Sequence, residues 1–311
     1  MTNNLHVVLG GSGAIGQAVI KALQEKNLNI RAVERSKAVA SVETIFADLL
    51  DQKQTAEALK GASHVYLCVG LPYESKVWEK DWPRLMKSVI EACALVNAKL
   101  IFFDNVYMYG PSPLAVPFAE NHEQKPVSIK GKVRKEIANL MIEAMNSGKI
   151  RGVIGRSATF YGPKAINSVL YISFLQNMLA GKNPQVIIGE GIKQVFAYTL
   201  DNGKALVTLA LDESANGEVW HLPVGEAVTV DQILANFNKE LNTNFKASYI
   251  NGFLLSFLSL FIKSLRESKE MLYLYENPHI MSWDKFKKKY PEFKVTSYEE
   301  GFKEMIKSFK N

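Results

Sequence analysis

The chain has 311 residues, of which 47% are hydrophobic and 22% charged, and its formal net charge is +6. This composition provides a sizeable core and excludes a disordered, collagen-like or disulfide-stapled chain. Because Cys68 and Cys93 lie in apolar surroundings and the five histidines show no ligand-like spacing, we expect reduced thiols, a cytoplasmic location and no metal site.

Short apolar runs alternate with segments of helical period from residue 5 to about residue 156. The runs are 5–9, 29–33, 43–47, 64–69, 99–103 and 151–155, and amphipathic stretches such as 14–26 and 82–97 lie between them. Continuous apolar strands are buried on both faces, which is typical of a parallel sheet with helices on each side. We therefore predict an α/β, Rossmann-type doubly wound parallel sheet, an NAD(P)-binding domain over residues 1–163.

The pattern changes after residue 163. A helical segment at 166–181 is followed by short strands at 185–189, 194–200 and 218–222, and the C-terminal part is mostly helical. No linker rich in glycine or proline separates the halves. We expect a smaller, mostly helical C-terminal substrate lobe over 164–311, packed tightly on the first domain, with segments near 194–222 that return to that domain.

Two stretches near the C-terminus bear on the kind of partner. The apolar stretch 253–262 is about half as long as a bilayer span of ~20 residues, so we expect a buried or pocket-lining helix and no membrane partner. The segment 284–294, "DKFKKKYPEFK", carries five lysines. We interpret it as a solvated helix end and expect no nucleic-acid partner, because no binding motif accompanies it.

A glycine-rich loop follows the first predicted strand, in "VVLGGSGAIGQAVI" (7–20). Glycines there allow a tight turn and a close approach of a pyrophosphate, which the N-terminus of the next helix favours through its free N–H groups and dipole. The strand before the loop and the helix after it give this short motif its specificity. The sequence therefore predicts a dinucleotide site at Gly10, Ser12, Gly13, Ala14, Ile15 and Gly16.

The spacing Gly10-x-x-Gly13-x-x-Gly16 resembles the extended and atypical branches of the short-chain dehydrogenase/reductase superfamily, the NAD-dependent epimerase/dehydratase group. Six further segments carry the resemblance: "FADLLD" (46–51), "CVG" (68–70), "DNVYMYGP" (104–111), "GRSATFYGP" (155–163), "FAYTLDNGKALVTLAL" (196–211) and "HLPVGEAVTVDQIL" (221–234). The likeness covers roughly residues 5–240. It implies that Asp48 and Leu49 hold the adenine and that Val69 and Gly70 lie against the cofactor.

The choice of nicotinamide cofactor depends on the end of the second predicted strand, "AVERSK" (32–37). Glu34 stands where an acid would hydrogen-bond the adenosine ribose and favour NAD. Arg35, next along, has the fork that clamps a 2′-phosphate and favours NADP. The pattern Arg-Ala-Val-x-Arg-Ser is more similar to NADP-using atypical members, so we expect NADP, with NAD as the alternative.

The resemblance also implies a catalytic Ser/Thr, Tyr and Lys, with the last two as Tyr-x-x-x-Lys on a helix. Asn105 matches the Ser/Thr position, and about 25 residues further on "KGKVR" (130–134) stands where Tyr-Gly-x-x-Lys is expected. Lys130 would then replace the tyrosine and Arg134 the lysine. A lysine ammonium donates a proton but is a poor base, since its reference pKa is about 10.4. The alternative is that 130–134 is an ordinary solvated helix face.

Together these features favour an NAD(P)-dependent oxidoreductase or epimerase/dehydratase-like enzyme that lacks the usual catalytic tyrosine. Its catalytic residues would be Asn105, Lys130 and Arg134, and its small-molecule substrate, anionic or carbonyl-bearing, would contact Asp104, Tyr107 and Thr159. The alternative is a non-catalytic NADP(H)-binding module or redox sensor. Relatives of this kind often pair through the helices that here span 82–97 and 128–146, which implies a homodimer. The apolar residues of these two helices are equally well explained as facing the sheet.

Overall fold

The computed structural model describes residues 4–250 and 263–310. Within these ranges one seven-stranded sheet has the order β10-β6-β5-β4-β1-β2-β3, with every neighbouring pair parallel. The strands are β1 (Leu5–Leu9), β2 (Asn29–Glu34), β3 (Glu43–Phe46), β4 (Ala62–Leu67), β5 (Lys99–Asp104), β6 (Gly152–Arg156) and β10 (Val219–His221). The predicted doubly wound parallel sheet is confirmed. The helix predicted at 253–262 lies outside the described residues.

The strand order reverses at β1, which lies between β2 and β4. Leu5 to Leu9 pair with Asn29 to Val33 on one side and with Ala62 to Leu67 on the other. In open α/β sheets the crevice outside the carboxyl ends of the strands at such a reversal is the usual place for a ligand. The fold therefore directs attention to the loops that follow β1, β4, β5 and β6.

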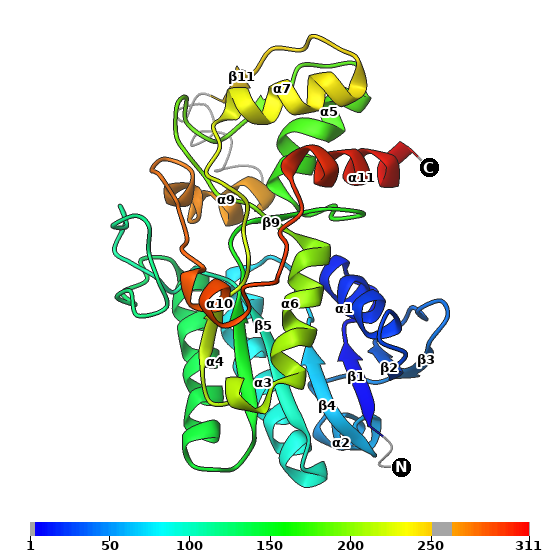
Figure 1. Ribbon diagram of the computed structural model, residues 1–311. Coiled ribbons are helices and arrows are strands. Elements are labelled where there is room, and N and C mark those ends of the chain that lie inside the picture. Colours follow the sequence, from blue (N-terminus) through cyan, green and yellow to red (C-terminus); the bar gives the residue numbers. More distant parts are fainter. Residues whose placement is uncertain (1–3, 251–262, 311) are drawn as a thin grey trace.

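Helices cover both faces of the sheet (Figure 1). One face carries α1 (Ala14–Gln24) and α6 (Thr199–Leu211), and the other carries α2 (Gln52–Ala58), α3 (Ser75–Val96) and α4 (Ile129–Asn146). Gly203 allows α6 to lie close to α1, since a Cβ there would be 2.4 Å from the carbonyl carbon of Ala18. The segment near 194–222 thus returns to the sheet as α6 and β10.

The remaining elements build the lobe above the carboxyl ends of the strands, apart from η2 and α10, which pack beside β10 (Figure 1). They are β7 (Phe160–Tyr161), η1 (Tyr171–Leu175), α5 (Gln176–Leu179), β8 (Gln185–Val186), β9 (Ala197–Tyr198), η2 (Glu213–Ala215), α7 (Val230–Leu241), β11 (Ser248–Tyr249), α9 (Lys263–Lys269), η3 (Leu272–Leu274), α10 (Asp284–Lys289) and α11 (Tyr298–Lys310). The lobe has its own apolar core, which α7 and α11 share through Phe237 and Phe302, whose rings stack 4.6 Å apart.

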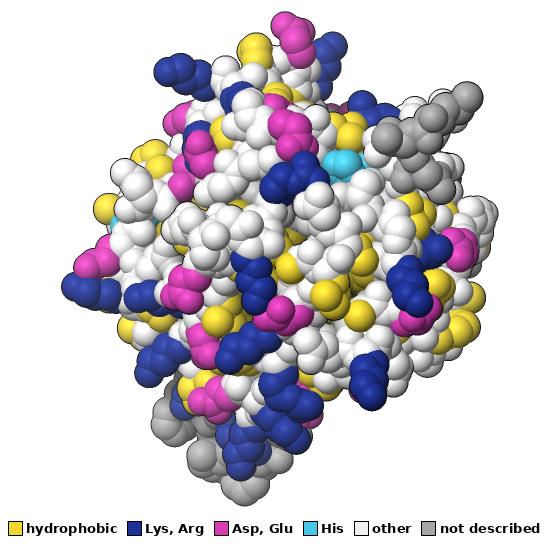
Figure 2. Space-filling model, turned by 90° about the horizontal axis from the view of Figure 1, so that it is seen from below, with side chains coloured by type: hydrophobic (Ala, Val, Ile, Leu, Met, Phe, Trp, Pro, Cys, Tyr) yellow, Lys and Arg dark blue, Asp and Glu magenta, His cyan; other side chains and the backbone are white. Residues whose placement is uncertain are grey.

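Two lysines of α10, Lys285 and Lys289, have partners at the surface. Lys285 Nζ lies 4.1 Å from the Trp220 ring centroid and 2.6 Å from Glu218 Oε2, and Lys289 Nζ is 3.3 Å from Asp212 Oδ2. Figure 2, which views the molecule from the end where the strands begin, shows basic and acidic side chains mixed over that face. Among the described residues, no helix has both the length and the hydropathy needed to cross a bilayer.

Two stacked histidines, His6 and His64, lie on neighbouring strands of the sheet. His6 on β1 is fully buried, its ring lies 4.5 Å from that of His64 on β4, and its Nδ1 pairs with the Tyr66 hydroxyl. Burial, with the neighbouring His64 charge, lowers the pKa of His6 to about 4. The unfolded chain, with a histidine pKa of about 6.5, therefore binds more protons than the folded one below that pH.

We expect the free energy of unfolding to fall as the pH drops from about 6.5 toward 4, with His6 contributing a loss of roughly 2 kcal/mol by pH 5. Urea unfolding at pH 7 and pH 5 measures this loss. The variant His6→Phe keeps a flat ring in the stack but has no proton to bind, so it should lose less stability between the two pH values. An identical loss in wild type and variant would mean that His6 does not titrate as its burial implies.

Candidate functional site

The glycine loop after β1 has the geometry of a phosphate cradle. Gly10 adopts φ +80°, and a Cβ on Gly16 would lie 2.1 Å from the Gly10 carbonyl oxygen, so the loop and the first turn of α1 pack backbone against backbone. Gly13 is the N-cap of α1 and has an open surface, because a Cβ there would meet only the Gly10 oxygen, at 3.4 Å. The first turn of α1, from Ala14 and Ile15, presents free N–H groups at this opening.

The end of β2 lies against this loop. Glu34 accepts hydrogen bonds from the Ser12 backbone N–H at 2.6 Å and from the Ser12 hydroxyl at 2.8 Å. Arg35 next to it is exposed, as are Ser36 and Lys37. The structure thus places the carboxylate of Glu34 at the rim of the phosphate loop and leaves Arg35 in solvent.

The other predicted cofactor residues follow β3 and β4. Asp48 is exposed and accepts from the Leu50 N–H at 3.0 Å, whereas Leu49 is buried. A Cβ on Gly10 would lie 3.0 Å from the Cα of Val69, so the chain after β4 touches the glycine loop, and Gly70 has open space around it. Gly10 and Val69 are brought together, and Asp48 follows β3, two strands away from β1 in the sheet.

Asp104, at the end of β5, is a fully buried carboxylate shared by two arginines. Arg134 on α4 donates through Nε to Oδ1 at 2.8 Å, and Arg156 at the end of β6 donates through Nε to Oδ2 at 3.2 Å. The Arg134 guanidinium also lies over the ring of Trp82, 4.8 Å from its centroid. One negative charge therefore compensates two positive ones in this buried group.

A series of buried hydrogen bonds continues from Arg156 through Tyr109 and His221 to Ser282. Arg156 Nη1 donates to the Tyr109 hydroxyl at 2.9 Å, Tyr109 pairs with His221 Nε2 at 2.7 Å, and His221 Nδ1 pairs with the Ser282 carbonyl at 2.7 Å. Burial lowers the pKa of His221 to about 3, so its ring is neutral at pH 7. Nδ1 then donates to Ser282 and Nε2 accepts from Tyr109. The Tyr109 hydroxyl is therefore occupied by hydrogen bonds to Arg156 and His221.

Lys130 is fully buried at the start of α4, whose N-cap Ser128 accepts from the Gly131 N–H at 3.0 Å. Its ammonium contacts Glu270 Oε1 at 2.6 Å, Glu267 Oε2 at 2.8 Å and the Ser75 hydroxyl at 2.9 Å. Glu267 belongs to α9 of the lobe, and Ser75 begins α3. Lys130 and Arg134 are both buried, so the alternative of a solvated helix face at 130–134 is wrong.

The predicted catalytic residue Asn105 and the predicted substrate contacts Asp104 and Thr159 come from neighbouring strand ends. Asn105 follows β5, is partly exposed, and accepts the Tyr107 N–H through Oδ1 at 3.1 Å. Thr159 follows β6 and is also partly exposed, and its side chain interacts with the Tyr275 hydroxyl. Asp104, by contrast, is committed to its two arginines. Whether Asn105, Lys130 and Arg134 act in catalysis stays a prediction.

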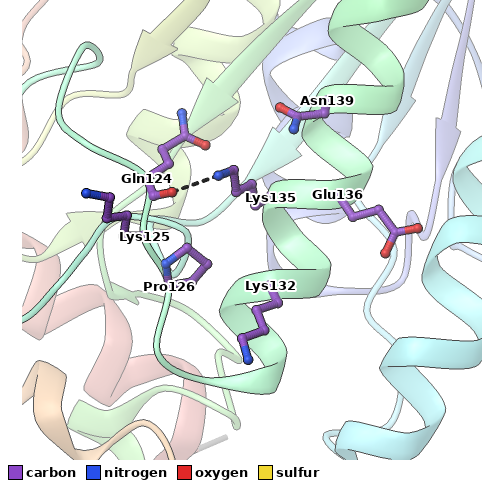
Figure 3. Close-up of a pocket in the computed structure, with 7 residues that line it drawn as sticks. All are labelled: Gln124, Lys125, Pro126, Lys132, Lys135, Glu136 and Asn139. Atoms are coloured by element: carbon purple, nitrogen blue, oxygen red, sulfur yellow. Dashed lines mark hydrogen bonds between the residues drawn. The ribbon is translucent and has the colours of Figure 1, made fainter.

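A shallow hollow of about 590 Å³ lies on the other side of α4 from Lys130. It is lined by Gln124, Lys125, Pro126, Lys132, Lys135, Glu136 and Asn139. Figure 3 shows these side chains around the space between the 124–126 loop and α4, with Lys135 Nζ donating to the Gln124 carbonyl at 2.8 Å. The hollow is separate from the residues that follow β5 and β6, so it does not belong to the candidate active site.

Sequence reasoning missed the partners of Lys130. Glu267 and Glu270 are two carboxylates three residues apart, but no motif connects them to a lysine 137 and 140 residues earlier. Ser75 was also missed, because the predicted helix began at residue 82. The only available signal was indirect: a lysine in a helix that packs on a sheet needs an opposite charge if it faces inward.

Comparison with protein families matches residues 6–222 to the NAD dependent epimerase/dehydratase family. No curated protein sequence matches the chain. Solved structures with the same fold include a UDP-N-acetylglucosamine 4-epimerase from Bacillus cereus, with a TM-score of 0.80, 14% identity and coverage of 99% of this chain and 97% of that one. Two others, both in complex with NAD, have TM-scores of 0.79. WbmH from Bordetella bronchiseptica is 13% identical and covers 99% of both chains, and a UDP-glucuronic acid 4-epimerase from B. cereus is 17% identical and covers 98% and 96%.

Proposed function

Because the chain belongs to the NAD dependent epimerase/dehydratase family, a family of enzymes, we propose that it catalyses nicotinamide-dependent chemistry at a hydroxyl or carbonyl carbon of a small molecule. The observation that supports this proposal is that the phosphate loop, Asn105 and Thr159 all lie at the carboxyl ends of the parallel strands. The phosphate loop follows β1, Asn105 follows β5 and Thr159 follows β6. Parallel strands place these loops around one crevice, where a cofactor and a substrate can meet.

The residues of this chain fit a dinucleotide. The opening at Gly13 leaves room for a pyrophosphate against the N-terminus of α1, whereas any side chain on Gly16 would collide with Gly10. Glu34 and Ser12 would hold the adenosine ribose, Asp48 and Leu49 the adenine, and Val69 and Gly70 the middle of the cofactor. When bound, the nicotinamide ring supplies or accepts the hydride.

The position of Glu34 favours NAD over the NADP that the sequence pattern suggests. Its carboxylate lies at the phosphate loop, bonded to Ser12, where it would accept from ribose hydroxyls and repel a 2′-phosphate. Several solved structures with this fold are complexes with NAD. We therefore propose NAD as the cofactor.

Changing Glu34→Ala should weaken NAD⁺ binding about 10- to 150-fold, because hydrogen bonds to a charged group contribute roughly 1.5–3 kcal/mol. The affinity for NADP⁺ should stay equal or rise, since the repelling charge is gone. Calorimetry with both cofactors measures the change. The matched control is Arg35→Ala, which should leave NAD⁺ affinity unchanged. If the wild-type protein binds NADP⁺ more tightly and Arg35→Ala removes that preference, Arg35 reads the phosphate and NADP is the cofactor.

The chemistry of the site suggests a neutral reacting group on the substrate. Lys130 faces two carboxylates, and Arg134 shares Asp104 with Arg156, so neither cation is free to attract an anion. A hydroxyl or carbonyl oxygen would instead meet the amide of Asn105 and the hydroxyl of Thr159. Several structures with this fold are named as 4-epimerases of UDP sugars, so nucleotide sugars are the first substrates to test.

The deciding experiment is a substrate screen with the purified chain. Carbonyl compounds and alcohols are followed by nicotinamide absorbance, and nucleotide sugars by chromatography, because an epimerisation returns the hydride and leaves the absorbance unchanged. Turnover that is lost in a variant unable to bind the cofactor supports the proposal. NAD binding with no turnover of any compound would favour the second candidate, a cofactor-binding module or redox sensor. The observation in its favour is that Lys130 and Arg134 are both saturated by internal partners.

We propose two further properties. A cytoplasmic location fits the two unpaired thiols, Cys68 and Cys93. A homodimer through α3 and α4 would have to use their outer faces, because Leu85, Val89 and Met141 are buried against the sheet. The mass of the chain in solution would decide between monomer and dimer.

A further inference from the structure

The loop between β5 and α4 holds one phenol rigidly beside the first turn of α4. The Tyr107 N–H donates to Asn105 Oδ1 at 3.1 Å, and its ring stacks on Trp78 with 6.5 Å between centroids and an interplanar angle of 18°. Its carbonyl oxygen lies so close to Gly131 that a Cβ there would approach it to 2.4 Å. Tyr107 is therefore fixed from both sides, next to the helix position that Lys130 occupies.

The two cations of this helix turn act on the same phenol. The Lys130 ammonium lies 4.5 Å from the ring centroid of Tyr73, and the hydroxyl of Tyr73 interacts with that of Tyr107. The Arg134 guanidinium lies 6.0 Å from the ring centroid of Trp78, on which Tyr107 stacks. Burial raises the pKa of Tyr107, while Tyr73, Arg134 and Lys130 act in the lowering direction. The phenol is thus neutral at pH 7, and Lys130 and Arg134, although each is already paired with carboxylates, favour its deprotonated form.

Tyr107 also lies on a line of hydroxyls that leads to the candidate substrate contacts. The Tyr275 hydroxyl is hydrogen-bonded to the side chain of Thr159 and is close enough to Tyr107 for the two phenols to influence each other's pKa. Asn105 accepts the backbone N–H of Tyr107, and Asn105, Tyr107 and Thr159 are all partly exposed. A substrate oxygen placed between Asn105 and Thr159 would therefore have a phenol within the same small region.

We propose that Tyr107 supplies the proton-transferring phenol of this site, from the loop after β5, while Lys130 and Arg134 serve as fixed cations around it. This inference rests on the proposed function. In the reducing direction, the Tyr107 hydroxyl would give its proton to the substrate carbonyl oxygen, and a bound reduced nicotinamide, becoming oxidised, would supply the hydride to the carbonyl carbon. The C=O π bond breaks, C–H and O–H bonds form, and the phenolate regains a proton from water.

The first test uses Tyr107→Phe, which keeps the ring on Trp78 and removes only the hydroxyl. With a substrate found by the screen, kcat should fall about 10²- to 10⁴-fold, the usual contribution of a general acid, with the affinity for NAD⁺ within about twofold of wild type. The control is Tyr290→Phe, which removes a hydroxyl bonded to Asp212 beyond the far end of α6 and should leave kcat unchanged. A Tyr107→Phe variant that keeps more than about a tenth of kcat would overturn the proposal.

The second test does not depend on turnover. In a crystal structure of the full chain with NAD⁺ bound, we expect the Tyr107 hydroxyl to lie nearer to C4 of the nicotinamide ring than Lys130 Nζ does. If Lys130 Nζ is the nearer group, the assignment to Tyr107 is wrong. A screen without any turnover would remove the proposed function, and the position of the Tyr107 hydroxyl in this complex would still decide whether the phenol belongs to the reaction site.

Discussion

Replacing Gly13 with valine should abolish dinucleotide binding while the protein stays folded. Gly13 has φ −73° and ψ 162°, a conformation that valine adopts readily, and its Cβ would meet only the Gly10 oxygen at 3.4 Å. The added methyl groups would occupy the opening where a pyrophosphate must approach the N-terminus of α1. Loss of two charge-assisted hydrogen bonds, at roughly 1.5–3 kcal/mol each, lowers NAD⁺ affinity by more than about a hundredfold.

Two neighbouring variants make this result specific. Gly13→Ala adds only the Cβ and should cause a smaller loss of NAD⁺ affinity than the valine. Gly16→Val places a Cβ 2.1 Å from the Gly10 oxygen, so it should lower the free energy of unfolding itself. Calorimetry with NAD⁺ and urea unfolding separate these effects. Unchanged NAD⁺ affinity in folded Gly13→Val protein would mean that this loop does not hold the cofactor.

The central sheet could be predicted because its strands are buried on both faces. Runs such as 5–9 and 99–103 are apolar without interruption, and the structure places β1 and β5 in the middle of the sheet with helices on both sides. The ends of these strands were predicted within two residues. A strand in the middle of the sheet is apolar at every position, and such a run of neighbouring residues can be recognised from the sequence alone.

Helix boundaries were harder to predict, and α3 shows the reason. The amphipathic stretch expected as a helix begins at residue 82, but α3 begins at Ser75 and runs through Pro83. The extra turns are stabilised by burial of Trp78 and Trp82, whose rings meet edge to face at 6.0 Å. Tertiary packing outweighs the cost of the missing N–H, and no local rule reports it.

The helix predicted at 166–181 is shorter in the structure, where local backbone geometry at its start delays the first helical turn. Lys164 has φ +54°, and Ser168 accepts from the Leu170 N–H at 3.2 Å, so the helical turns begin only after it and continue as η1 and α5. Ile166 continues the apolar pattern on the N-terminal side of Ser168, but its side chain is exposed and does not belong to the buried face of the helix.

The candidate site was predicted in position but not in its electrostatics. Motif spacing placed Asn105, Lys130 and Arg134 near one another, and the structure brings them to the region after β5. The charges that surround Lys130 come from the lobe, where sequence similarity to the family is weakest. Sequence spacing therefore located the lysine without identifying the carboxylates that determine its behaviour.

Replacing Lys130 with methionine should lower the free energy of unfolding by about 3–5 kcal/mol, because it leaves buried carboxylates without their cation. The side chains of Glu267 and Glu270 are only 16% and 20% exposed, and both bind the Lys130 ammonium. This contact also joins α4 and α3 of the sheet domain to the lobe. Urea unfolding measures the loss, and Lys132→Met, on an exposed position of the same turn, is the matched control and should change stability by less than about 0.5 kcal/mol.

The pH dependence of this loss identifies its cause. Burial would raise the pKa of the Glu267 carboxyl, but hydrogen bonds from Lys130 and Ser75 lower it to about 2. An unfolded glutamate has a pKa of about 4.3, so this stabilisation is present above pH 4.3 and is lost as the pH falls toward 2. The deficit of Lys130→Met should therefore shrink below about pH 4, where protonated carboxyls no longer need a cation. It should also be smaller in a Glu267→Gln background, because one of the two charges is already absent. A deficit that is independent of pH and of Glu267 would mean that lost packing, and not the ion pair, is the cause.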